Sequence, residues 1–384
     1  MKLAILTDGI FPFAIGGMQK HSFYLAKFLV QQGVDVTLVH CVTQGKVPTR
    51  DQVLATMELS EAPNLRIIGF KFPKAGWLPG HYVKENYLYS IQIFEELKSQ
   101  WNEFDFIYAK GFSAWHLLNK KRKGKNLPPI GVKFHGYEMF QPAPSFRVKM
   151  EHYLLRGPVK FNNINADYIF SYGGKISELV RKEFKTNLSN IIELPTGIEA
   201  AWCIDAPVEK VNLIRKFIFI GRFERRKGVE ELNQVLRSLP KETPFSFDFI
   251  GPIPPSQYIK DDRIIYHGKM MEKEKIQAIL DQCDVLVTPS HSEGMPNVIM
   301  EGMARGLAVI ATDVGAVAAQ VNEENGWLIQ PANIAALKKS ILEAIECSDA
   351  VLLGKRNTSL ERVKNQFTWE EVAKETLEKI KAIV

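Results

Sequence analysis

The chain has 384 residues, of which 46% are hydrophobic and 24% are charged. These fractions are ordinary for a globular protein, and at about 100–200 residues per domain the length predicts two domains. The formal net charge is +6, but residues 1–200 hold 25 basic and 17 acidic side chains, a balance of +8, whereas residues 201–384 have a balance of −2. The four cysteines lie far apart with no Cys-x-x-Cys pair, which argues against a zinc site or a redox motif and predicts buried thiols in a reducing compartment.

The first half of the chain alternates apolar strands with helical patterns. Strands are predicted at Lys2–Thr7, Val34–Val42, Leu65–Phe70, Phe104–Ala109, Ile130–Phe134, Tyr168–Ser171 and Ile191–Leu194. Helices are predicted over about Met18–Gln31, Tyr82–Trp101 and Phe146–Asn163. Continuous apolar strands between helices indicate a parallel sheet that is covered on both faces.

The pattern lapses into a polar connection at Pro195–Lys216 and then restarts. Strands are predicted at Lys216–Gly221, Phe245–Gly251, Ile264–Gly268, Val285–Thr288 and Leu307–Ala311, and helices at Val229–Ser238 and Thr368–Ile380. The sequence therefore predicts an α/β protein with two Rossmann-like units in series. Ligands of such sheets bind beyond the carboxyl ends of the strands, so the residues that follow each strand are the candidates for function.

No targeting or membrane-spanning segment is predicted. The apolar run at Lys2–Leu6 is too short for a signal peptide, and no stretch approaches the roughly 20 apolar residues of a membrane span. We therefore expect a cytoplasmic protein. The excess of basic residues in the first half, with its densest cluster at Lys120–Lys125, fits either an anionic partner or a solvated surface.

Two glutamates, Glu293 and Glu301, flank a predicted strand-to-helix turn in the segment S-E-G-M-P-N-V-I-M-E. Pro296 or Asn297 is expected to start the helix, which puts Glu293 in the loop and Glu301 in the first turns. The two carboxylates can then reach two groups of one ligand. The free amides at the helix start, in the segment Gly294–Asn297, suit hydroxyl or phosphate groups.

The whole run Thr288–Gly315 resembles the signature of the large retaining E-x7-E glycosyltransferases, glycosyl transferases group 1 of family 4, which have the GT-B fold. The segment Gly221–Gly228, G-R-F-E-R-R-K-G, resembles the phosphate clamp of the same family. The glycine pair Gly16-Gly17, the pair His135-Gly136 and the segment Pro195–Ile198 extend the resemblance over nearly the whole chain.

This resemblance implies two Rossmann-like domains with parallel sheets that face each other across a cleft. It implies that residues 1–200 bind the acceptor, that residues 201–366 bind a nucleotide sugar, and that residues 367–384 form a helix packing back on the first domain. The implied reaction moves a hexosyl or N-acetylhexosaminyl unit from a UDP-, GDP- or ADP-sugar to a hydroxyl, with retention of the anomeric configuration. The acceptor would be a glycan or a lipid-linked glycan of cell-surface polysaccharide, lipopolysaccharide or glycolipid synthesis, and no nucleic acid partner is expected.

The resemblance also assigns roles to individual residues. Glu293 would contact hydroxyls of the donor sugar, Glu301 would bind the ribose, and His135 would face the donor sugar. The donor would also meet the helix start formed by Gly294, Met295, Pro296 and Asn297. Gly16 and Gly17 follow the first strand, where the absence of side chains allows a phosphate or the acceptor to approach the backbone.

Arg222 and Lys227 have a chemical rationale of their own. Negative charge grows on the leaving nucleoside diphosphate as the glycosidic bond breaks, and fixed cations beside those oxygens stabilise that transition state. The neighbouring Arg225 and Arg226 are expected to be solvated.

No Asp-x-Asp pair is present, so no metal cofactor is expected, because the cationic clamp can replace a metal ion. A Gly-x-Gly-x-x-Gly fingerprint after the first strand, a Gly-x-Ser-x-Gly elbow and a Walker motif are also missing, which disfavours a dehydrogenase, a hydrolase of that type and a kinase.

Two alternatives remain open. One is a GT-B-fold nucleotide-sugar epimerase or hydrolase, and the other is a non-catalytic protein that binds sugar nucleotides. The excess of basic residues further predicts peripheral association of the first domain with an anionic membrane, at the inner face of the cell membrane.

Overall fold

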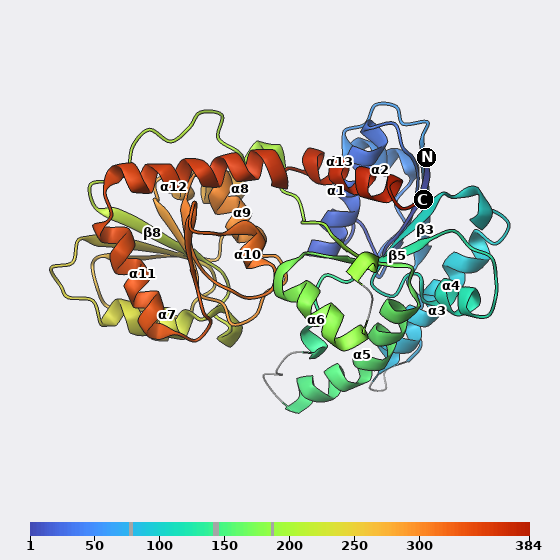
Figure 1. Ribbon diagram of the computed structural model, residues 1–384, viewed down its shortest axis with the longest axis horizontal. Coiled ribbons are helices and arrows are strands. Elements are labelled where there is room, and N and C mark those ends of the chain that lie inside the picture. Colours follow the sequence, from blue (N-terminus) through green and yellow to red (C-terminus); the bar gives the residue numbers. More distant parts are fainter. Residues whose placement is uncertain (77–79, 141–145, 186–187) are drawn as a thin grey trace. The chain divides into compact units, whose positions relative to one another are not determined.

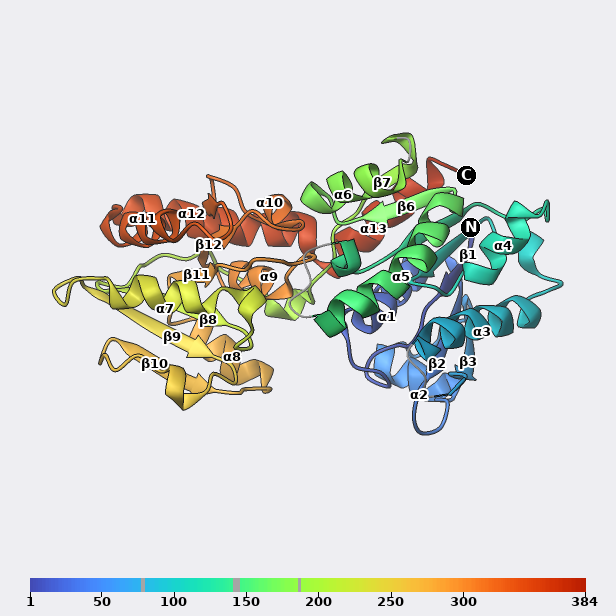
Figure 2. The same ribbon diagram turned by 90° about the horizontal axis from the view of Figure 1, so that it is seen from below.

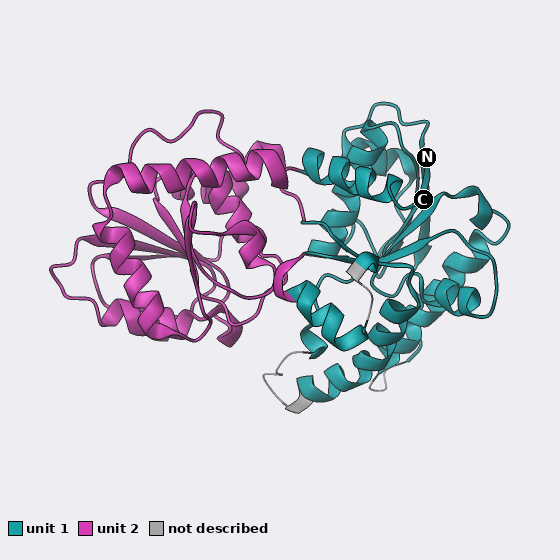
Figure 3. Ribbon diagram, in the orientation of Figure 1, with its two compact units in different colours: residues 1–172, 176–195, 369–384 teal, residues 173–175, 196–368 magenta. Residues whose placement is uncertain are grey.

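The computed structural model describes residues 1–76, 80–140, 146–185 and 188–384. The chain divides into two compact units (Figure 3). Unit 1 comprises Met1–Tyr172, Ile176–Pro195 and Trp369–Val384, and unit 2 comprises Gly173–Lys175 and Thr196–Thr368. Each unit is built around one parallel sheet with helices on both faces (Figures 1 and 2).

The sheet of unit 1 has seven parallel strands in the order β3-β2-β1-β4-β5-β6-β7. These strands are β1 (Lys2–Leu6), β2 (Asp35–Val42), β3 (Leu65–Lys71), β4 (Phe106–Lys110), β5 (Ile130–Lys133), β6 (Tyr168–Ser171) and β7 (Ile191–Glu193). The helices are α1 (Gly17–Gln31), α2 (Arg50–Met57), α3 (His81–Glu96), α4 (Trp115–Arg122), α5 (Phe146–Asn165), α6 (Gly174–Phe184) and α13 (Trp369–Lys381).

Alternate residues of the unit 1 strands supply two cores, one on each face of the sheet. Leu3 and Ile5 of β1 pack with α1, α2 and α13, whereas Ala4 and Leu6 pack with α3, α4, α5 and α6. This is the period-2 alternation of a strand buried on both faces. The carboxy-terminal helix α13 contributes Ala373, Leu377 and Ile380 to the first core and packs against α1.

The sheet of unit 2 has six parallel strands in the order β10-β9-β8-β11-β12-β13. These strands are β8 (Arg215–Ile220), β9 (Phe245–Ile250), β10 (Ile264–Gly268), β11 (Val285–Thr288), β12 (Ala308–Thr312) and β13 (Gly326–Ile329). The helices are α7 (Val229–Arg237), α8 (Lys273–Leu280), α9 (Asn297–Ala304), α10 (Val317–Gln320), α11 (Ile334–Glu346) and α12 (Asp349–Arg362), the last followed by a π-helical turn at Val363–Phe367.

In both sheets the strand order reverses beside the first strand. The chain runs outward through β1, β2 and β3 and then returns to β4 beside β1, and it runs through β8, β9 and β10 and returns to β11 beside β8. The connections that follow the two central strands therefore diverge and leave a crevice at the carboxyl edge, which is where open parallel sheets bind ligands.

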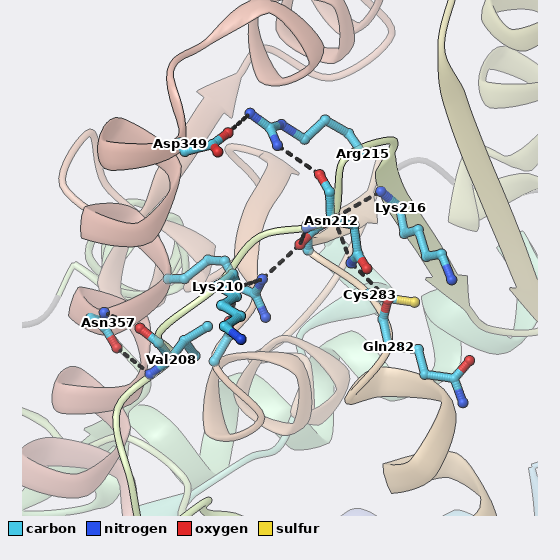
Figure 4. Close-up of polar contacts among 12 residues, drawn as sticks. Val208, Lys210, Asn212, Arg215, Lys216, Gln282, Cys283, Asp349 and Asn357 are labelled. Atoms are coloured by element: carbon cyan, nitrogen blue, oxygen red, sulfur yellow. Dashed lines mark hydrogen bonds and ion pairs between the residues drawn. The ribbon is translucent and has the colours of Figure 1, made fainter.

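A polar network fixes the start of unit 2 at the opposite, amino edge of its sheet (Figure 4). Asp284, which is fully buried, accepts hydrogen bonds from the backbone N–H groups of Asn212 and Lys216 and forms an ion pair of 2.6 Å with the buried Arg356. Arg356 also donates to the carbonyl of Gly306. The carboxylate is thus fully satisfied, as a buried charge must be, and the network ties the connecting segment to the sheet.

The predicted strands lie where the apolar runs placed them, to within two residues at each end, but β13 was not predicted. Other predictions were wrong in detail. The helix predicted to end at Trp101 ends at Glu96, because the buried Trp101 belongs to a separate 3-10 turn and its indole N–H donates to the carbonyl of Phe94. Of the four cysteines, Cys41 and Cys283 are buried, but Cys203 and Cys347 are partly exposed.

Candidate active site

The candidate site of unit 2 lies at its strand-order reversal, on the loops that follow the adjacent strands β8 and β11. The first loop, Gly221–Gly228, carries the cations of the predicted clamp, and the second, Pro289–Pro296, carries Glu293. The two loops are joined directly, because the backbone N–H of His291 donates to the carbonyl of Arg226 at 2.7 Å.

Two glycines allow the close packing of these loops. Gly228 has a left-handed φ of 68°, and a Cβ there would lie 2.0 Å from the carbonyl oxygen of Pro289. Gly315, which follows β12, has a φ of 57°, and a Cβ there would lie 2.2 Å from the carbonyl oxygen of Glu293. Because only glycine fits both the conformation and the space, the positions of Lys227 and Glu293 depend on these two residues.

Glu293 and Lys227 meet in this site. The Lys227 ammonium lies 2.6 Å from Glu293 Oε1, and the same oxygen accepts a hydrogen bond of 2.8 Å from the Ser290 hydroxyl. The side chain of Glu293 is 7% exposed and that of Lys227 is 14% exposed, so the pair is largely shielded from water. A carboxylate and an ammonium held side by side can bind a hydroxyl and an adjacent phosphate of one ligand.

Arg222 and Arg226 share a carboxylate that the sequence reasoning did not select. Arg222 Nη1 lies 2.8 Å from one oxygen of Glu224, and Arg226 Nε lies 2.8 Å from the other. Arg226 also reaches Glu293, with 3.5 Å between Nη1 and Oε2. Arg226 is 43% exposed, as expected of a solvated residue, but its side chain also bridges Glu224 and Glu293.

Arg225 points into a different cluster. Its guanidinium lies 2.6 Å from Glu231 Oε1, and it contacts His291 Nε2 at 2.7 Å. The side chain is 57% exposed, as expected of a solvated residue, but it is held by an ion pair. Arg225 and Arg226 both lie in the 3-10 turn Arg225–Lys227, and the turn directs their side chains to different carboxylates.

Helix α9 begins at Asn297 with Pro296 as its N-cap residue, as predicted, and Glu301 follows in its second turn. Gly294 accepts a hydrogen bond of 2.7 Å from the backbone N–H of Ala316. The Met295 side chain is 8% exposed, and its sulfur accepts from the backbone N–H of Thr196. The Met295 side chain is therefore used for packing, and only the backbone of Met295 can contact a ligand.

The three remaining predicted residues lie in unit 1, at the same edge of its sheet. Gly16 and Gly17 form the start of α1, with Gly16 as the N-cap residue. His135 follows β5, its Nδ1 contacts the Tyr172 hydroxyl, and its Nε2 has no hydrogen-bond partner among the residues that the structure describes. Burial, together with the nearby Lys110 and Lys133, holds the pKa of His135 well below its usual value, so the imidazole is neutral at pH 7.

Unit 1 also holds buried cations that the sequence reasoning missed. Lys110 and Lys133 are 1% and 0% exposed and lie directly opposite each other on β4 and β5. The Lys110 ammonium lies 2.7 Å from His21 Nδ1, and the Lys133 ammonium donates to the carbonyl of Leu194 at 2.9 Å. Burial lowers the pKa of Lys133 to about 7 and places the pKa of Lys110 well below its usual value, with the second ammonium adding to the effect on Lys110.

Asp8, just after β1, has its pKa raised to about 6, chiefly by burial.

Within the described residues, no group of three or more His, Cys, Asp or Glu side chains could hold a metal ion. None of the helices in the described part of the chain is long and apolar enough to cross a membrane.

Residues 214–347 match the family described as glycosyl transferases group 1. A teichuronic acid biosynthesis glycosyltransferase assigned as putative in Bacillus subtilis is 33% identical over 127 residues, which are 33% of this chain and 32% of that protein. The alignment thus spans about a third of that relative. An N,N'-diacetylbacillosaminyl-diphospho-undecaprenol alpha-1,3-N-acetylgalactosaminyltransferase of Campylobacter jejuni is 22% identical over 304 residues, 73% of this chain and 77% of that protein.

Solved structures superimpose on the whole chain, and two of them illustrate the likeness. The lipopolysaccharide outer core galactosyltransferase WaaB superimposes with a TM-score of 0.71 at 16% identity, over 100% of both chains. An Anabaena protein, Alr3699/HepE, solved with UDP and glucose, superimposes with a TM-score of 0.64 at 15% identity, also over 100% of both chains.

Residues 214–347 thus match the group 1 glycosyltransferases, and the whole chain has the GT-B fold. The family match covers β8, β9, β10, β11, β12 and β13, and it therefore includes the part of the chain that carries Lys227 and Glu293.

Proposed function

We propose that this glycosyltransferase moves a hexosyl or N-acetylhexosaminyl unit from a nucleoside diphosphate sugar to an acceptor hydroxyl, with retention of the anomeric configuration. The observation that carries the proposal is the pairing of Lys227 with Glu293 at the strand-order reversal of unit 2. An ammonium suited to phosphate and a carboxylate suited to sugar hydroxyls lie in contact, as a ligand containing both groups requires.

In this proposal Arg222 and Lys227 bind the diphosphate, and Glu293 accepts hydrogen bonds from sugar hydroxyls. Glu301, half-buried in α9, binds the ribose, and the N-terminus of α9 supplies backbone donors. His135 is proposed as a further contact to the donor. When its Nδ1 accepts from Tyr172, its Nε2 carries the proton and can donate it to a hydroxyl.

The proposed reaction is a front-face substitution. The bond between the anomeric carbon and the β-phosphate oxygen breaks, and a bond from the acceptor oxygen to the same face of that carbon forms. The acceptor proton passes to the departing phosphate oxygen, and the cations stabilise the charge that develops on the diphosphate. No metal ion is needed in this scheme, because Lys227 and Arg222 supply the positive charge.

UDP is the first nucleotide to test, since a structural neighbour was solved with UDP and glucose. Cell-surface polysaccharide or lipopolysaccharide synthesis is the proposed setting, because the relatives include enzymes named for teichuronic acid synthesis and for a diphospho-undecaprenol substrate. We therefore propose a glycan or lipid-linked glycan as the acceptor, at the cytoplasmic face of the membrane.

The proposed membrane contact uses the basic surface of unit 1. The cluster at 120–125 is partly occupied within the fold, because Lys121 pairs with Asp167 at 2.5 Å and Lys125 lies over the Phe94 ring at 4.5 Å. Arg122 and Lys123 are exposed and remain suited to anionic lipid, with about 1 kcal/mol expected for each cation near the surface.

Sedimentation with vesicles tests this contact. Binding to anionic vesicles that falls with salt, is lost with neutral vesicles and weakens in the double variant R122S/K123S would support it. Equal recovery with both vesicle types would remove the membrane proposal.

The reaction itself is tested by incubating the protein with UDP-, GDP- or ADP-sugars, with and without lipid-linked glycan acceptors, and analysing the products. The proposal predicts glycosylated acceptor with an α linkage from an α-linked donor. Release of free nucleotide independent of any acceptor would instead identify a hydrolase or epimerase. Nucleotide binding without turnover would identify a non-catalytic protein.

A further inference from the structure

The loop Gly221–Gly228 contains two basic residues beyond the assigned phosphate ligands, Arg225 and Arg226. Arg222 and Lys227 were selected from the sequence, but Arg226 lies between Glu224 and Glu293, with its guanidinium 2.8 Å and 3.5 Å from their carboxylate oxygens. Because Glu293 also holds Lys227 at 2.6 Å, Arg226 and Lys227 converge on one carboxylate from the same loop. Whatever binds beside Lys227 is therefore within reach of Arg226.

Glu224 is the counter-ion of this group. Its two oxygens are used separately, one by Arg222 and one by Arg226, each at 2.8 Å. The carboxylate thus links two guanidinium groups as a phosphate would, by accepting from both. Its side chain is 31% exposed, and those of Arg222 and Arg226 are 66% and 43% exposed.

The exposure of these ion pairs decides how readily the arginines can exchange the Glu224 carboxylate for a phosphate. Solvent-exposed ion pairs contribute only about 0–1 kcal/mol, whereas an arginine can bind phosphate through two parallel hydrogen bonds. A diphosphate can thus replace the Glu224 carboxylate at small cost. Three cations, Arg222, Arg226 and Lys227, then face it with only Glu293 as an internal anion.

We propose that Arg226 is a third cation of the diphosphate site, and that Glu224 is the internal carboxylate that the diphosphate displaces from Arg226 and Arg222. This inference rests on the proposed function. Glu224 weakens the binding of the donor and of the nucleoside diphosphate product, and its return to the two arginines assists product release.

Arg225 shows that the inference depends on geometry and not on the basic character of the loop. It has the same charge and neighbours Arg226 in the sequence, but Glu231 and His291 hold it in another direction. Glu230 lies 3.7 Å from Arg225 and makes no contact with Arg222 or Arg226 among the ion pairs of the described residues. Replacing Glu230 therefore removes one nearby negative charge without releasing the clamp.

Calorimetric titration of UDP, GDP and ADP into the wild-type chain first finds the nucleotide that binds most tightly. With that nucleotide, E224Q should lower the dissociation constant by about tenfold, R226A should raise it by about tenfold, and E230Q should change it less than twofold. In the double variant E224Q/R226A, the gain from E224Q should shrink, because one of its two partners is gone. E224D, which keeps the charge, should stay close to wild type.

An unchanged or raised dissociation constant in E224Q, with a wild-type thermal midpoint showing that the variant is folded, would overturn the role of Glu224. Unchanged affinity in R226A would overturn the role of Arg226. In both cases the wild type still binds nucleotide and the proposed function stands. If none of the three nucleotides binds the wild type, the proposed function and this inference fail together.

Discussion

The two sheets reverse their strand order in the same way, yet the basic side chains near the two reversals differ in exposure and in their carboxylate partners. In unit 2 the cations lie on loops, are 14–66% exposed and are paired with carboxylates. In unit 1 Lys110 and Lys133 lie on the strands themselves, are fully buried, and have no carboxylate within ion-pair distance among the described residues. The comparison teaches that one fold can hold basic side chains in ion pairs on its loops and can also bury them on its strands without a carboxylate partner.

The difference follows from where each residue sits relative to the strand end. Register places Lys110 opposite Lys133, on the face of the sheet that α1 and α13 cover. A buried ammonium without a carboxylate pays a large desolvation penalty, which lowers its pKa. Arg222 and Lys227 follow their strand by two or more residues, on a loop where each has a carboxylate within ion-pair distance.

The largest expected effect is on turnover, when the exchangeable cations of unit 2 are removed. Lys227→Ala should raise the barrier by about 2–4 kcal/mol, the scale of one preorganised electrostatic contact. Arg222→Ala should cost less, because its side chain is 66% exposed and that of Lys227 is 14% exposed. Steady-state kinetics measures both losses, and wild-type turnover in both variants would contradict the phosphate assignment.

The buried cations of unit 1 should instead affect stability. The pKa of Lys133 is lowered to about 7, below its unfolded value, so above pH 7 the unfolded chain holds this proton more tightly than the folded chain does. The free energy of unfolding should therefore rise with pH from about 7 towards 10, by at most about 1.4 kcal/mol per pH unit from this group.

Lys133→Met removes that titration. Urea unfolding of the wild type and the variant at pH 7 and pH 9 should show a smaller rise in the variant. Equal rises in the two proteins would mean that Lys133 is not the buried cation described here.

A smaller effect is expected at Glu301. Glu301→Gln should weaken binding of the free nucleoside diphosphate by about tenfold, because the carboxylate is proposed to accept hydrogen bonds from the ribose. Calorimetric titration measures the change. Wild-type affinity for the nucleotide, with a loss only for the intact nucleotide sugar, would move Glu301 from the ribose to the sugar.

Removal of metal should have no effect. With Lys227 and Arg222 supplying the positive charge, turnover should be unchanged in saturating EDTA. Loss of activity that Mg²⁺ or Mn²⁺ restores would contradict a metal-free clamp.

The sequence predicted the strands well because buried parallel strands are continuous apolar runs. It missed β13, since Gly326–Ile329 is a four-residue edge strand in which Trp327 and Leu328 are only half-buried. It also missed Lys110 and Lys133, because their closeness depends on the register between strands that are distant in the sequence.

The candidate residues of unit 2 were selected from the family resemblance and from the charge that develops on the leaving group, but their pairing could not be predicted from the sequence. Glu224 and Arg226 are two residues apart, and in this chain the 3-10 turn Arg225–Lys227 brings their side chains together. The charged run F-E-R-R-K is compatible with a solvated loop, so only the backbone geometry distinguishes the role of Arg226 from that of Arg225.

Glu293→Gln tests most directly the claim that unit 2 binds a nucleotide sugar with Glu293 on the sugar and the cations on the diphosphate. Calorimetric titration of the nucleoside diphosphate and of the matching nucleotide sugar should show that the variant binds the free nucleotide no more weakly than the wild type. The additional affinity contributed by the sugar, and turnover with it, should be lost. Weaker binding of the free nucleotide, with the contribution of the sugar intact, would place Glu293 on the nucleotide and contradict the account.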